Sequence, residues 1–511
     1  MRTTNSIKNI FYNILLNSMT ILIGLVAQSI FIRTLGSEYN GLKSLFTSII
    51  SMLSISELGF GIAIIYNLYK PVASHDTEKI KTLVKYYQKI YRFIALVILI
   101  IGLCLLPFIP LFVGKISIDV HLQLVFLLFL SDAIVSYLMT YKRSIIQADQ
   151  KEYLISKINI LYLFLVNFVQ IIILLLTKNF IYYLLIRVLF RFIENMTINH
   201  VANKKYPYLK EKNIEPLEEE LKKNIHQKVK GLLFHKIGDY IVSGTDSIII
   251  SVTLGLGQLG LYNNYYFITN YVNILFGQIF SSVTSSVGNL IVEDKPKKTL
   301  QIYKTMLFAN TWIYCFCSIC IFVLIEPFIT IWIGKEYLLS TGVLLALVIN
   351  FYFQGLRKTD TTFKEAAGIF FEDRYISIVE AIINIVFSLL FVHFFGLAGV
   401  LMGTICSTMV LFLYSFPKYI FKSLFSKGYI DYFKIHVFNL LKAIFIFLIS
   451  VTILSLIPYT NVFLKLLINA ILCLFIPNFL YILLSHKSVE FSFLKKMVKE
   501  LWKKKKDNKN G

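Results

Sequence analysis

The chain has 511 residues, of which 57% are hydrophobic and only 16% are charged, and its formal net charge is +22. A water-soluble domain carries about 25% charged residues, so this composition excludes an ordinary soluble protein. Apolar runs of about 20 residues, the length that crosses a bilayer as a helix, recur from one end of the chain to the other. No alternating strand pattern competes with them. The sequence therefore predicts an all-α, polytopic membrane protein.

The apolar runs predict fourteen membrane-spanning helices. In chain order they cover residues 10–32, 42–69, 93–113, 120–141, 157–177, 180–200, 233–254, 261–291, 305–333, 342–357, 376–395, 397–416, 436–457 and 461–484. If the N-terminus is cytoplasmic, the outer turns hold only six basic residues, which are Arg33, Lys43, Lys115, Lys178, Lys335 and Lys465. Because cytoplasmic loops are the basic ones, we expect both termini in the cytoplasm. Basic loops against anionic lipids explain the net charge without nucleic acid as a partner.

Longer polar segments and the order of the spans predict five parts of the chain. We expect an N-terminal lobe of six spans (1–202), a cytoplasmic linker (203–231), a C-terminal lobe of six spans (232–416), an extra helix pair (417–484) and a basic cytoplasmic tail (485–511). The tail surrounds one apolar helical face with lysines, a pattern typical of a helix that lies on the membrane surface. A disordered basic tail beyond Trp502 is the alternative.

One turn occurs twice in the sequence. TLGSEYNGL at 34–42 returns as TLGLGQLGL at 253–261, with Thr, Leu, Gly, Gly and Leu each shifted by 219 positions. At this offset the first two spans lie over the seventh and eighth, so both copies enter the membrane in the same direction. Parallel repeats related by an axis along the membrane normal are found in transporters that move two lobes against each other. The repeat predicts two six-helix lobes in a parallel pseudo-twofold arrangement.

Polar side chains form stripes at equivalent positions of the two predicted lobes. Within each stripe the residues recur at steps of three or four, which places them on one helix face. The stripes are Asn17, Thr20 and Gly24 in the first span, Ser44, Thr47, Ser51 and Ser54 in the second, Lys236, Asp239, Ser243 and Asp246 in the seventh, and Asn263, Tyr266, Asn270 and Asn273 in the eighth. Such residues also serve as contacts between membrane helices. Four stripes at one offset favour a water-filled path between lobes.

Two arginines lie within the sixth predicted span, where a charged side chain costs about 2.5 kcal/mol or more at the helix centre. Arg187 and Arg191 are one helical turn apart. Their planar guanidinium groups suit the oxygens of a diphosphate, which favours an anion site. An intramembrane ion pair with Glu194, Asp132 or Glu57 is the alternative interpretation.

Other charged residues within spans leave their roles open. Glu57 either pairs with an arginine, carries a proton, or caps the kink region Gly59–Gly61. Asp239 and Asp246 share the stripe of the seventh span, which favours a position facing a cavity. At the cytoplasmic end of the tenth span, we expect three side chains to extend to the polar membrane surface; these are Arg357, Lys358 and Asp360.

Motifs of known enzyme classes are missing from the sequence. It contains no P-loop, no HExxH and no GxSxG, and the outer turns are too short to hold a catalytic domain. Cys315, Cys317 and Cys320 have no His or carboxylate at ligand spacing, so we interpret them as small packing residues. We therefore expect a protein that is not an enzyme and that needs no metal or other cofactor.

Several stretches together resemble a known family. TLGSEYNGL, SISELGFGIAIIYNLYKP, KIGDYIVSGTDSIIIS, GLYNNYYFITNYVN and GLAGVLMGT are similar to bacterial polysaccharide flippases of the multidrug/oligosaccharidyl-lipid/polysaccharide exporter superfamily. The resemblance runs from about residue 5 to residue 485. It implies two six-helix lobes that form a V, with spans one, two, seven and eight lining the gap and two additional helices at the C-terminal end.

The resemblance also implies a function. A flippase of this family would move undecaprenyl-diphosphate-linked oligosaccharide to the outer leaflet of the bacterial cytoplasmic membrane by alternating access, for surface polysaccharide biosynthesis. Its partners would include other polysaccharide assembly proteins. The arginines would hold the head group and the polar stripes would face the sugar. The candidate substrate-binding residues are Arg187, Arg191, Asp239, Asp246, Glu57, Asp132, Asn263, Tyr266, Asn270 and Asn273.

Alternative functions of two kinds stay open at this stage. A lipid II flippase and a cation-coupled multidrug exporter belong to the same superfamily and share the implied fold. An exporter would couple transport to Na⁺ or H⁺ through acidic residues such as Asp239 and Asp246. The other kind comprises proteins that transport nothing. These are a membrane enzyme, such as a polysaccharide polymerase, and a scaffold.

Overall fold

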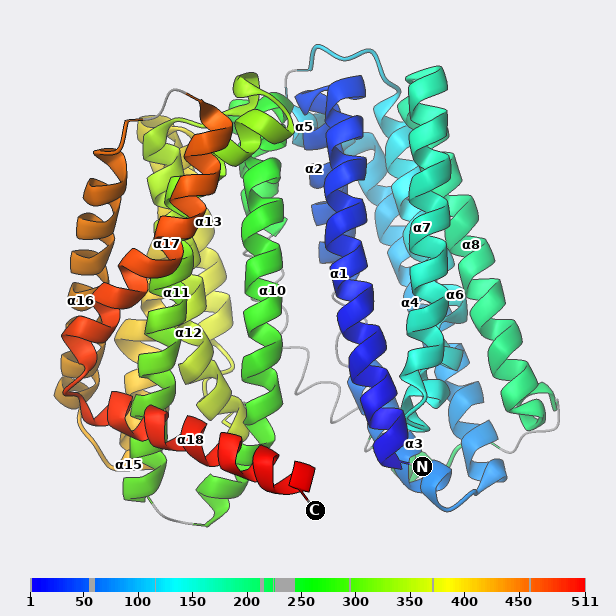
Figure 1. Cartoon of the computed structure of the whole chain (residues 1–511). Helices are drawn as coiled ribbons and strands as arrows, with labels where there is room; N and C mark the ends of the chain where they lie inside the picture. Colours follow the sequence, from blue (N-terminus) through cyan, green and yellow to red (C-terminus); the bar gives the residue numbers. More distant parts are fainter. Residues whose placement is uncertain are drawn as a thin grey trace. The chain divides into compact units, whose positions relative to one another are not determined.

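The computed structural model describes the chain apart from residues 1, 55–59, 115, 212–215, 224, 226–243, 294–295, 370–371, 459–460 and 511. The described residues form helices joined by short turns, and no strand occurs among them (Figure 1). The predicted all-α class is confirmed. The chain divides into two compact units, Met1–Asn263 and Asn264–Gly511.

The first unit contains helices from α1 to the start of α10. Their bounds are α1 Arg2–Leu35, α2 Ser37–Leu53, α3 Phe60–Ala73, α4 Thr77–Leu105, α5 Ile109–Val113, α6 Leu122–Ala148, α7 Glu152–Thr177, α8 Phe180–Lys205, a helix at Gly244–Leu254, and α10 Leu256–Val292. Short 3₁₀ turns join some of them. The boundary between the units lies within α10.

The second unit contains the rest of α10 and the helices that follow it. Their bounds are α11 Pro296–Trp332, α12 Thr341–Ala366, α13 Ile376–Phe395, α14 Leu397–Val410, α15 Lys422–Phe425, α16 Tyr429–Ser455, α17 Val462–Ser485 and α18 Val489–Asn510. Two π-helical turns, Leu411–Ser415 and Pro417–Phe421, separate α14 from α15. Helix α18 agrees with the helical interpretation of the basic tail.

Ten of the described helices are long and apolar enough to cross a membrane, and they coincide with ten of the predicted spans. The second predicted span contains α2, which ends at Leu53, and the start of α3 at Phe60, and residues 55–59 between them lie outside the described residues. The seventh lies partly outside the described residues. Helices α8 and α12 carry the charged side chains noted above, which lower their hydropathy. The total of fourteen spans stays a prediction.

The repeated turn has the same backbone geometry in both copies. Gly36 and Gly255 each have a φ of +89°, a left-handed conformation that glycine adopts without steric cost. The Gly36 N–H donates to Ile32 O (2.8 Å) and the Gly255 N–H donates to Ser251 O (3.1 Å). These acceptors are themselves equivalent residues of the repeat. The chain therefore ends one helix and begins the next in the same way at both places.

The second glycine of the repeated turn allows two helix starts to touch within the first unit. A Cβ atom on Gly41 of α2 would lie 2.0 Å from Leu256 O, and one on Gly260 of α10 would lie 1.9 Å from Ser37 O. The Asn40 side chain ties the two together, because its Nδ2 donates to Gly260 O (2.9 Å). Only glycine permits this approach of the two backbones.

Helix α6 organises the first unit by packing against α4 on one side and α8 on the other, while α1 packs against α7. The α4–α6 contact is close because Gly102 faces the Leu130 side chain, which a Cβ atom would approach to 2.6 Å. Asp132, two residues further along α6, lies on the other side of the helix and contacts Arg187 of α8.

Helix α11 has the same role in the second unit, where it contacts α12, α16 and α17. Gly355 of α12 lies against the Tyr314 ring of α11, and a Cβ atom there would lie 1.9 Å from a ring carbon. Helices α13 and α14 form a second tight pair, with Gly403 against Ser388. Tyrosine against glycine gives α11 and α12 a fixed register.

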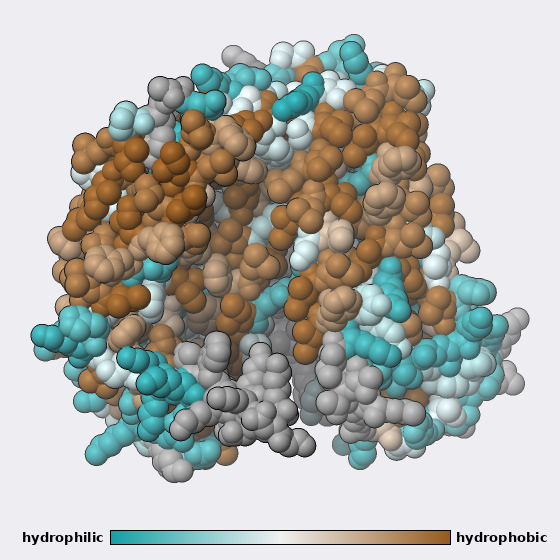
Figure 2. All heavy atoms as spheres, in the orientation of Figure 1, coloured by the Kyte–Doolittle hydropathy of each residue, from teal (hydrophilic) through white to brown (hydrophobic). Residues whose placement is uncertain are grey.

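On the face seen in Figure 2, hydrophobic side chains cover the middle of the molecule, and hydrophilic ones gather toward its upper and lower ends. Large apolar side chains are exposed along α7 and α16, including Leu161, Phe164, Phe168, Leu175, Phe438, Leu441 and Leu448. A soluble monomer rarely exposes apolar surface on this scale. Contact with lipid explains it, as expected of membrane-spanning helices.

Candidate functional site

Helix α8 places the predicted arginine pair opposite α6. It begins at Asn179, whose Oδ1 accepts a hydrogen bond from the Ile181 N–H (2.8 Å) and so caps the helix. From this start, Arg187, Arg191 and Glu194 fall on one helical face. That face meets α6 at the buried Asp132.

Asp132 binds both arginines. Its Oδ2 accepts a hydrogen bond from Nε of Arg187 (2.9 Å) and lies 2.9 Å from Nη2 of the same residue. Its Oδ1 lies 3.3 Å from Nε of Arg191. The Arg187 guanidinium also lies over the Phe129 ring, 5.4 Å from its centroid. One carboxylate therefore fixes two guanidinium planes one turn apart.

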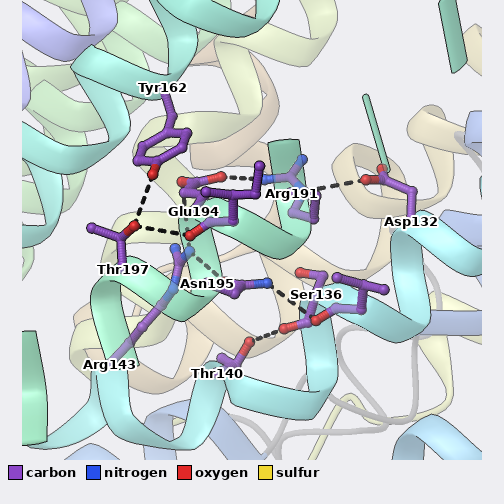
Figure 3. Close-up of polar contacts among 11 residues, drawn as sticks. Asp132, Ser136, Thr140, Arg143, Tyr162, Arg191, Glu194, Asn195 and Thr197 are labelled. Atoms are coloured by element: carbon purple, nitrogen blue, oxygen red, sulfur yellow. Dashed lines mark hydrogen bonds and ion pairs between the residues drawn. The ribbon is translucent and has the colours of Figure 1, made fainter. Parts of the chain in front are cut away.

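Glu194 is the second carboxylate of the cluster (Figure 3). Its Oε2 lies 3.3 Å from Nη1 of Arg191, and its Oε1 lies 3.6 Å from Nη2 of Arg143. Arg143 also donates to Asn195 Oδ1 (2.9 Å), and Asn195 Nδ2 donates to Val135 O (3.1 Å). Together these contacts join α6 and α8 in a continuous polar chain.

A cavity of about 380 Å³ lies against this cluster, between α1, α7 and α8. Arg187, Arg191 and Glu194 form its charged wall. The remaining polar residues of the wall come from all three helices, namely Asn17, Thr20, Asn159, Tyr162, Gln170 and Tyr183. The arginine pair and the polar face of the first predicted span therefore share one cavity.

The charge balance of the cluster favours an anion in that cavity. Three guanidinium groups face two carboxylates, which leaves one excess positive charge. The side chains of Arg187 and Arg191 are 32% and 35% exposed, whereas that of Asp132 is only 9% exposed. A guanidinium carries five N–H donors, so Asp132 occupies only part of the donor set. Both interpretations of the arginines, as ion pairs and as ligands of an anion, fit this geometry.

The other predicted site residues lie apart from this cluster or outside the described residues. Glu57 and Asp239 belong to the latter group. Asp246 is buried in the helix Gly244–Leu254, next to Ser247, whose hydroxyl is hydrogen-bonded to that of Ser48 (2.9 Å). Asp246 does not belong to the residues that line the cavity of the arginine cluster.

The stripe of the eighth span runs along α10, and its members have different surroundings. Asn263 Nδ2 donates to Asn40 Oδ1 (3.1 Å), at the glycine crossing. Tyr266 is exposed and Asn270 is half-buried. Asn273 Oδ1 accepts a hydrogen bond from the Tyr314 hydroxyl (3.2 Å). Two of the four thus contribute to helix packing.

The hydroxyl groups of the second span bond largely to their own helix. Thr47 donates to Lys43 O (2.7 Å), Ser51 to Thr47 O (2.8 Å) and Ser54 to Ile50 O (2.8 Å). A hydroxyl that donates to the carbonyl four residues earlier keeps its acceptor lone pairs. These side chains therefore retain the capacity to accept hydrogen bonds from a ligand.

Arg143 and Asn195 are functional candidates that the sequence did not reveal. Arg143 falls just beyond the predicted end of the fourth span, at residue 141, so it counted as a basic loop residue. Helix α6 continues to Ala148, which turns Arg143 toward Glu194. The one available signal was its spacing of eleven residues from Asp132, three turns along a helix.

Asp360 does not extend to the membrane surface, and the expectation for it was wrong. Its side chain is fully buried and accepts a hydrogen bond from the Tyr303 hydroxyl (2.6 Å). Arg357, expected at the surface as well, pairs with the buried Glu380 (3.1 Å). Packing of α12 against α11 draws this helix end inward, which hydropathy alone does not indicate.

Comparison with known proteins identifies both a sequence family and a fold. The family described as polysaccharide biosynthesis protein matches residues 6–286. Among solved structures, the lipid II flippase MurJ in an inward closed conformation is similar at a TM-score of 0.67 and 14% identity, over 93% of this chain and 99% of that one. No curated protein matches the sequence.

Two multidrug transporters share the fold as well. An inward-facing MATE family transporter of the MOP superfamily has a TM-score of 0.59 at 14% identity, covering 77% of this chain and 91% of its own. A mutant form of the Vibrio cholerae MATE transporter VcmN has a TM-score of 0.55 at 12% identity, covering 83% of this chain and 99% of its own. At such identities the likeness concerns the fold alone.

Proposed function

The chain belongs to the polysaccharide biosynthesis protein family, and from this premise we propose that it flips undecaprenyl-diphosphate-linked oligosaccharide repeat units across the bacterial cytoplasmic membrane. Family and fold together support a multi-pass membrane transporter of the flippase class. The cytoplasmic position of both termini and the identity of the cargo are parts of the proposal. The observation that carries it is the arginine pair on the wall of a polar cavity.

The arginine pair suits the charged part of such a cargo. A lipid diphosphate presents several anionic oxygens close together, and guanidinium groups bind such oxygens in pairs. Arg187 and Arg191 stand one turn apart, with Asp132 holding both at 2.9–3.3 Å. Because their geometry is fixed before the ligand arrives, less entropy is lost on binding. The excess positive charge of the cluster offsets part of the charge of the ligand.

The uncharged part of the cavity suits a glycan. Sugars present many hydroxyl groups that both donate and accept hydrogen bonds, and amides and phenols can satisfy either role. Asn17, Asn159 and Gln170 line the cavity together with Tyr162 and Tyr183. The polar stripe of α10 would extend this surface during transport. The head group would thus be held by charge and the sugars by neutral polar walls.

Alternating access would supply the movement. Two lobes built from a parallel repeat would open the cavity first toward the cytoplasm and then toward the outer leaflet. The close contact of α2 and α10 at Gly41 and Gly260 brings equivalent parts of the repeat together. Helices that move about this contact, or that close the cavity beside it, would need such a close approach. No covalent chemistry enters this account, in line with a protein that is not an enzyme.

A reconstituted flipping assay tests the proposal. Purified protein would be placed in vesicles with a fluorescent polyprenyl-diphosphate oligosaccharide, and the fraction reached by a membrane-impermeant quencher would be followed with time. We expect flipping by the wild type and its loss in the double variant Arg187→Gln, Arg191→Gln. Equal flipping by this variant would show that the arginines do not bind the diphosphate. Flipping of lipid II or of a cationic drug alone would favour the alternative functions.

A further inference from the structure

A buried group of titratable side chains lies in the second unit, where three helices meet. Asp360 of α12 and Tyr303 of α11 have no exposed surface, and His436 of α16 is 7% exposed. No part of the proposed transport site includes them. Their burial is notable because a buried carboxylate without a cationic partner is costly.

The hydrogen bonds within this cluster assign the position of one proton. The Tyr303 hydroxyl donates to Asp360 Oδ1 at 2.6 Å and lies 3.0 Å from Nε2 of His436. The hydroxyl has a single proton, so it accepts the bond from Nε2–H when it donates to the carboxylate. This places His436 in the tautomer with its proton on Nε2. The second carboxylate oxygen, Oδ2, lies 3.8 Å from the same ring nitrogen.

Two atoms of the cluster have no hydrogen-bond partner among the described residues. They are Asp360 Oδ2 and His436 Nδ1, and both are buried. Native structures leave few buried polar atoms unpaired, and each such atom calls for a physical reason. A site that gains and loses a proton provides one, because each of these atoms is where a proton can be added.

The described surroundings contain no cation that would neutralise the carboxylate. The titratable groups that face Asp360 are Tyr303 from α11 and Tyr432 and His436 from α16. The nearby Lys364 of α12 pairs with Asp373 instead. Within the part of the chain that the structure describes, no Lys or Arg lies within ion-pair distance of Asp360.

Aromatic rings enclose the cluster. Tyr303 lies between Phe363, Phe421 and Phe425. The centroid of its ring is 5.1–5.4 Å from the centroid of each of these three rings. The ring of His436 lies 4.1 Å from that of Tyr432. Such a shell excludes water and lowers the local dielectric constant, which strengthens every charge effect inside it.

The charge states of the cluster differ by one proton. With Asp360 ionised and His436 neutral, the enclosed site holds one uncompensated negative charge, which is strongly unfavourable in a buried site. One proton taken from water by the carboxylate makes the site neutral without leaving a buried charge. The hydrogen bonds through Tyr303 are the same in either case. Enclosure therefore favours the protonated state, and opening to water favours release.

We propose that Asp360, Tyr303 and His436 form a proton-binding site that takes up one proton when α16 closes on α11 and α12 and releases it when these helices separate. Phe412 and Phe421, which contact His436 and Tyr303, lie in the two π-helical turns. Such turns are frequent at functional sites. Because the backbone is irregular there, the two phenylalanine rings can move without unfolding a regular helix. Coupling of this proton to cargo movement rests on the proposed function, whereas the proton site itself does not.

Infrared difference spectroscopy on the full-length protein in lipid nanodiscs tests the site directly. Spectra recorded across a pH titration reveal a buried carboxylic acid by its carbonyl band. We expect this band in the wild type and its loss in Asp360→Asn, a variant that keeps the size of the protonated side chain. The matched control is Asp373→Asn, which removes a buried carboxylate that is already paired with Lys364 and bonded to Ser415. It should leave the band in place.

A second measurement on the same samples keeps the test informative if one variant is unstable. The melting temperature of the wild type should fall as the pH rises through neutrality, where the unfolded chain has released the proton of His436 and the closed site still holds one. His436→Gln should enlarge this dependence, because the unfolded variant no longer has an imidazole that binds a proton. An unchanged band and an unchanged pH dependence in Asp360→Asn would overturn the proposal. Neither readout needs a cargo, so failure of the flippase proposal would be seen separately, in the flipping assay.

Discussion

At the scale of single residues, the shared carboxylate of Asp132 is the feature on which the proposed transport site depends. It is buried and holds Arg187 and Arg191, both of which line the cavity. An ion pair and an anion site are usually alternatives. Here they are compatible, because the carboxylate uses only part of each guanidinium and directs the rest. The ion pairs are the means by which the site is organised in advance.

Replacing both arginines by lysine tests the need for planar groups. In the variant Arg187→Lys, Arg191→Lys the charge stays but the fork geometry is lost. Loss of charge-assisted bonds worth about 1.5–3 kcal/mol should slow flipping about tenfold or more, with normal membrane insertion. The measurement is the initial rate in the vesicle assay, and Arg374→Lys, in the other unit, serves as control. Wild-type rates in the double variant would show that only charge matters.

Asp132→Asn should affect stability as well as transport. The amide has the same shape but leaves two arginines without their shared counter-ion. Because the arginine side chains are about one third exposed, water compensates partly, and we expect a loss of about 1–3 kcal/mol in the free energy of unfolding. Thermal denaturation of the purified protein measures it. A melting temperature equal to that of the wild type would mean that the ion pairs contribute nothing net.

At the scale of elements, the repeated turn connects a sequence pattern to a backbone contact. Gly36 and Gly255 share one left-handed conformation, and Gly41 and Gly260 allow α2 and α10 to touch. The repeat was visible in the sequence because both glycines are required at each copy. Contact between the copies was not, since spacing along a chain does not state which helices meet.

Gly260→Ala should disrupt the crossing of α2 and α10. The added Cβ would lie 1.9 Å from Ser37 O, too close for any real contact, so the helices must separate. The control is Gly277→Ala in the same helix, where nothing lies within 4 Å and alanine gains about 0.5–1 kcal/mol of helix stability. We expect a lower melting temperature and slower flipping in the first variant only. Identical behaviour of the two variants would count against a functional crossing.

Helix ends explain most of what the sequence left undetermined. The class of the fold, the arginine pair and Asp132 follow from apolar runs and from charges inside them. The extension of α6 to Arg143 and the burial of Asp360 do not. Each of these depends on which helix packs against the segment in question. Hydropathy averages over about twenty residues and therefore blurs such changes at the last turns.

At the scale of the whole molecule, the distribution of basic residues predicts which ends of the helices face the cytoplasm. The turn between α7 and α8 contains one basic residue, Lys178. The turn after α3, in contrast, leads into the first turns of α4, which are rich in lysine. The positive-inside rule places the first turn outside and the second inside. The same rule places both termini in the cytoplasm.

Cysteine labelling of intact cells checks this orientation. In a variant without the six native cysteines, Lys178→Cys should react with a membrane-impermeant maleimide. His75→Cys, at an exposed turn on the opposite side, should react only after the cells are permeabilised. The reverse pattern would invert the topology, and with it the direction of the proposed transport.

The most direct test of the central claim is a deletion strain analysed for surface polysaccharide and, by mass spectrometry, for lipid-linked oligosaccharide. A flippase for this cargo predicts loss of the polymer together with accumulation of intact undecaprenyl-diphosphate-linked repeat units on the cytoplasmic side of the membrane. Restoration by the wild-type gene, but not by the Arg187→Gln, Arg191→Gln variant, would tie the defect to the arginine pair. Normal surface polysaccharide in the deletion strain, with altered drug sensitivity instead, would contradict the account and favour a multidrug exporter.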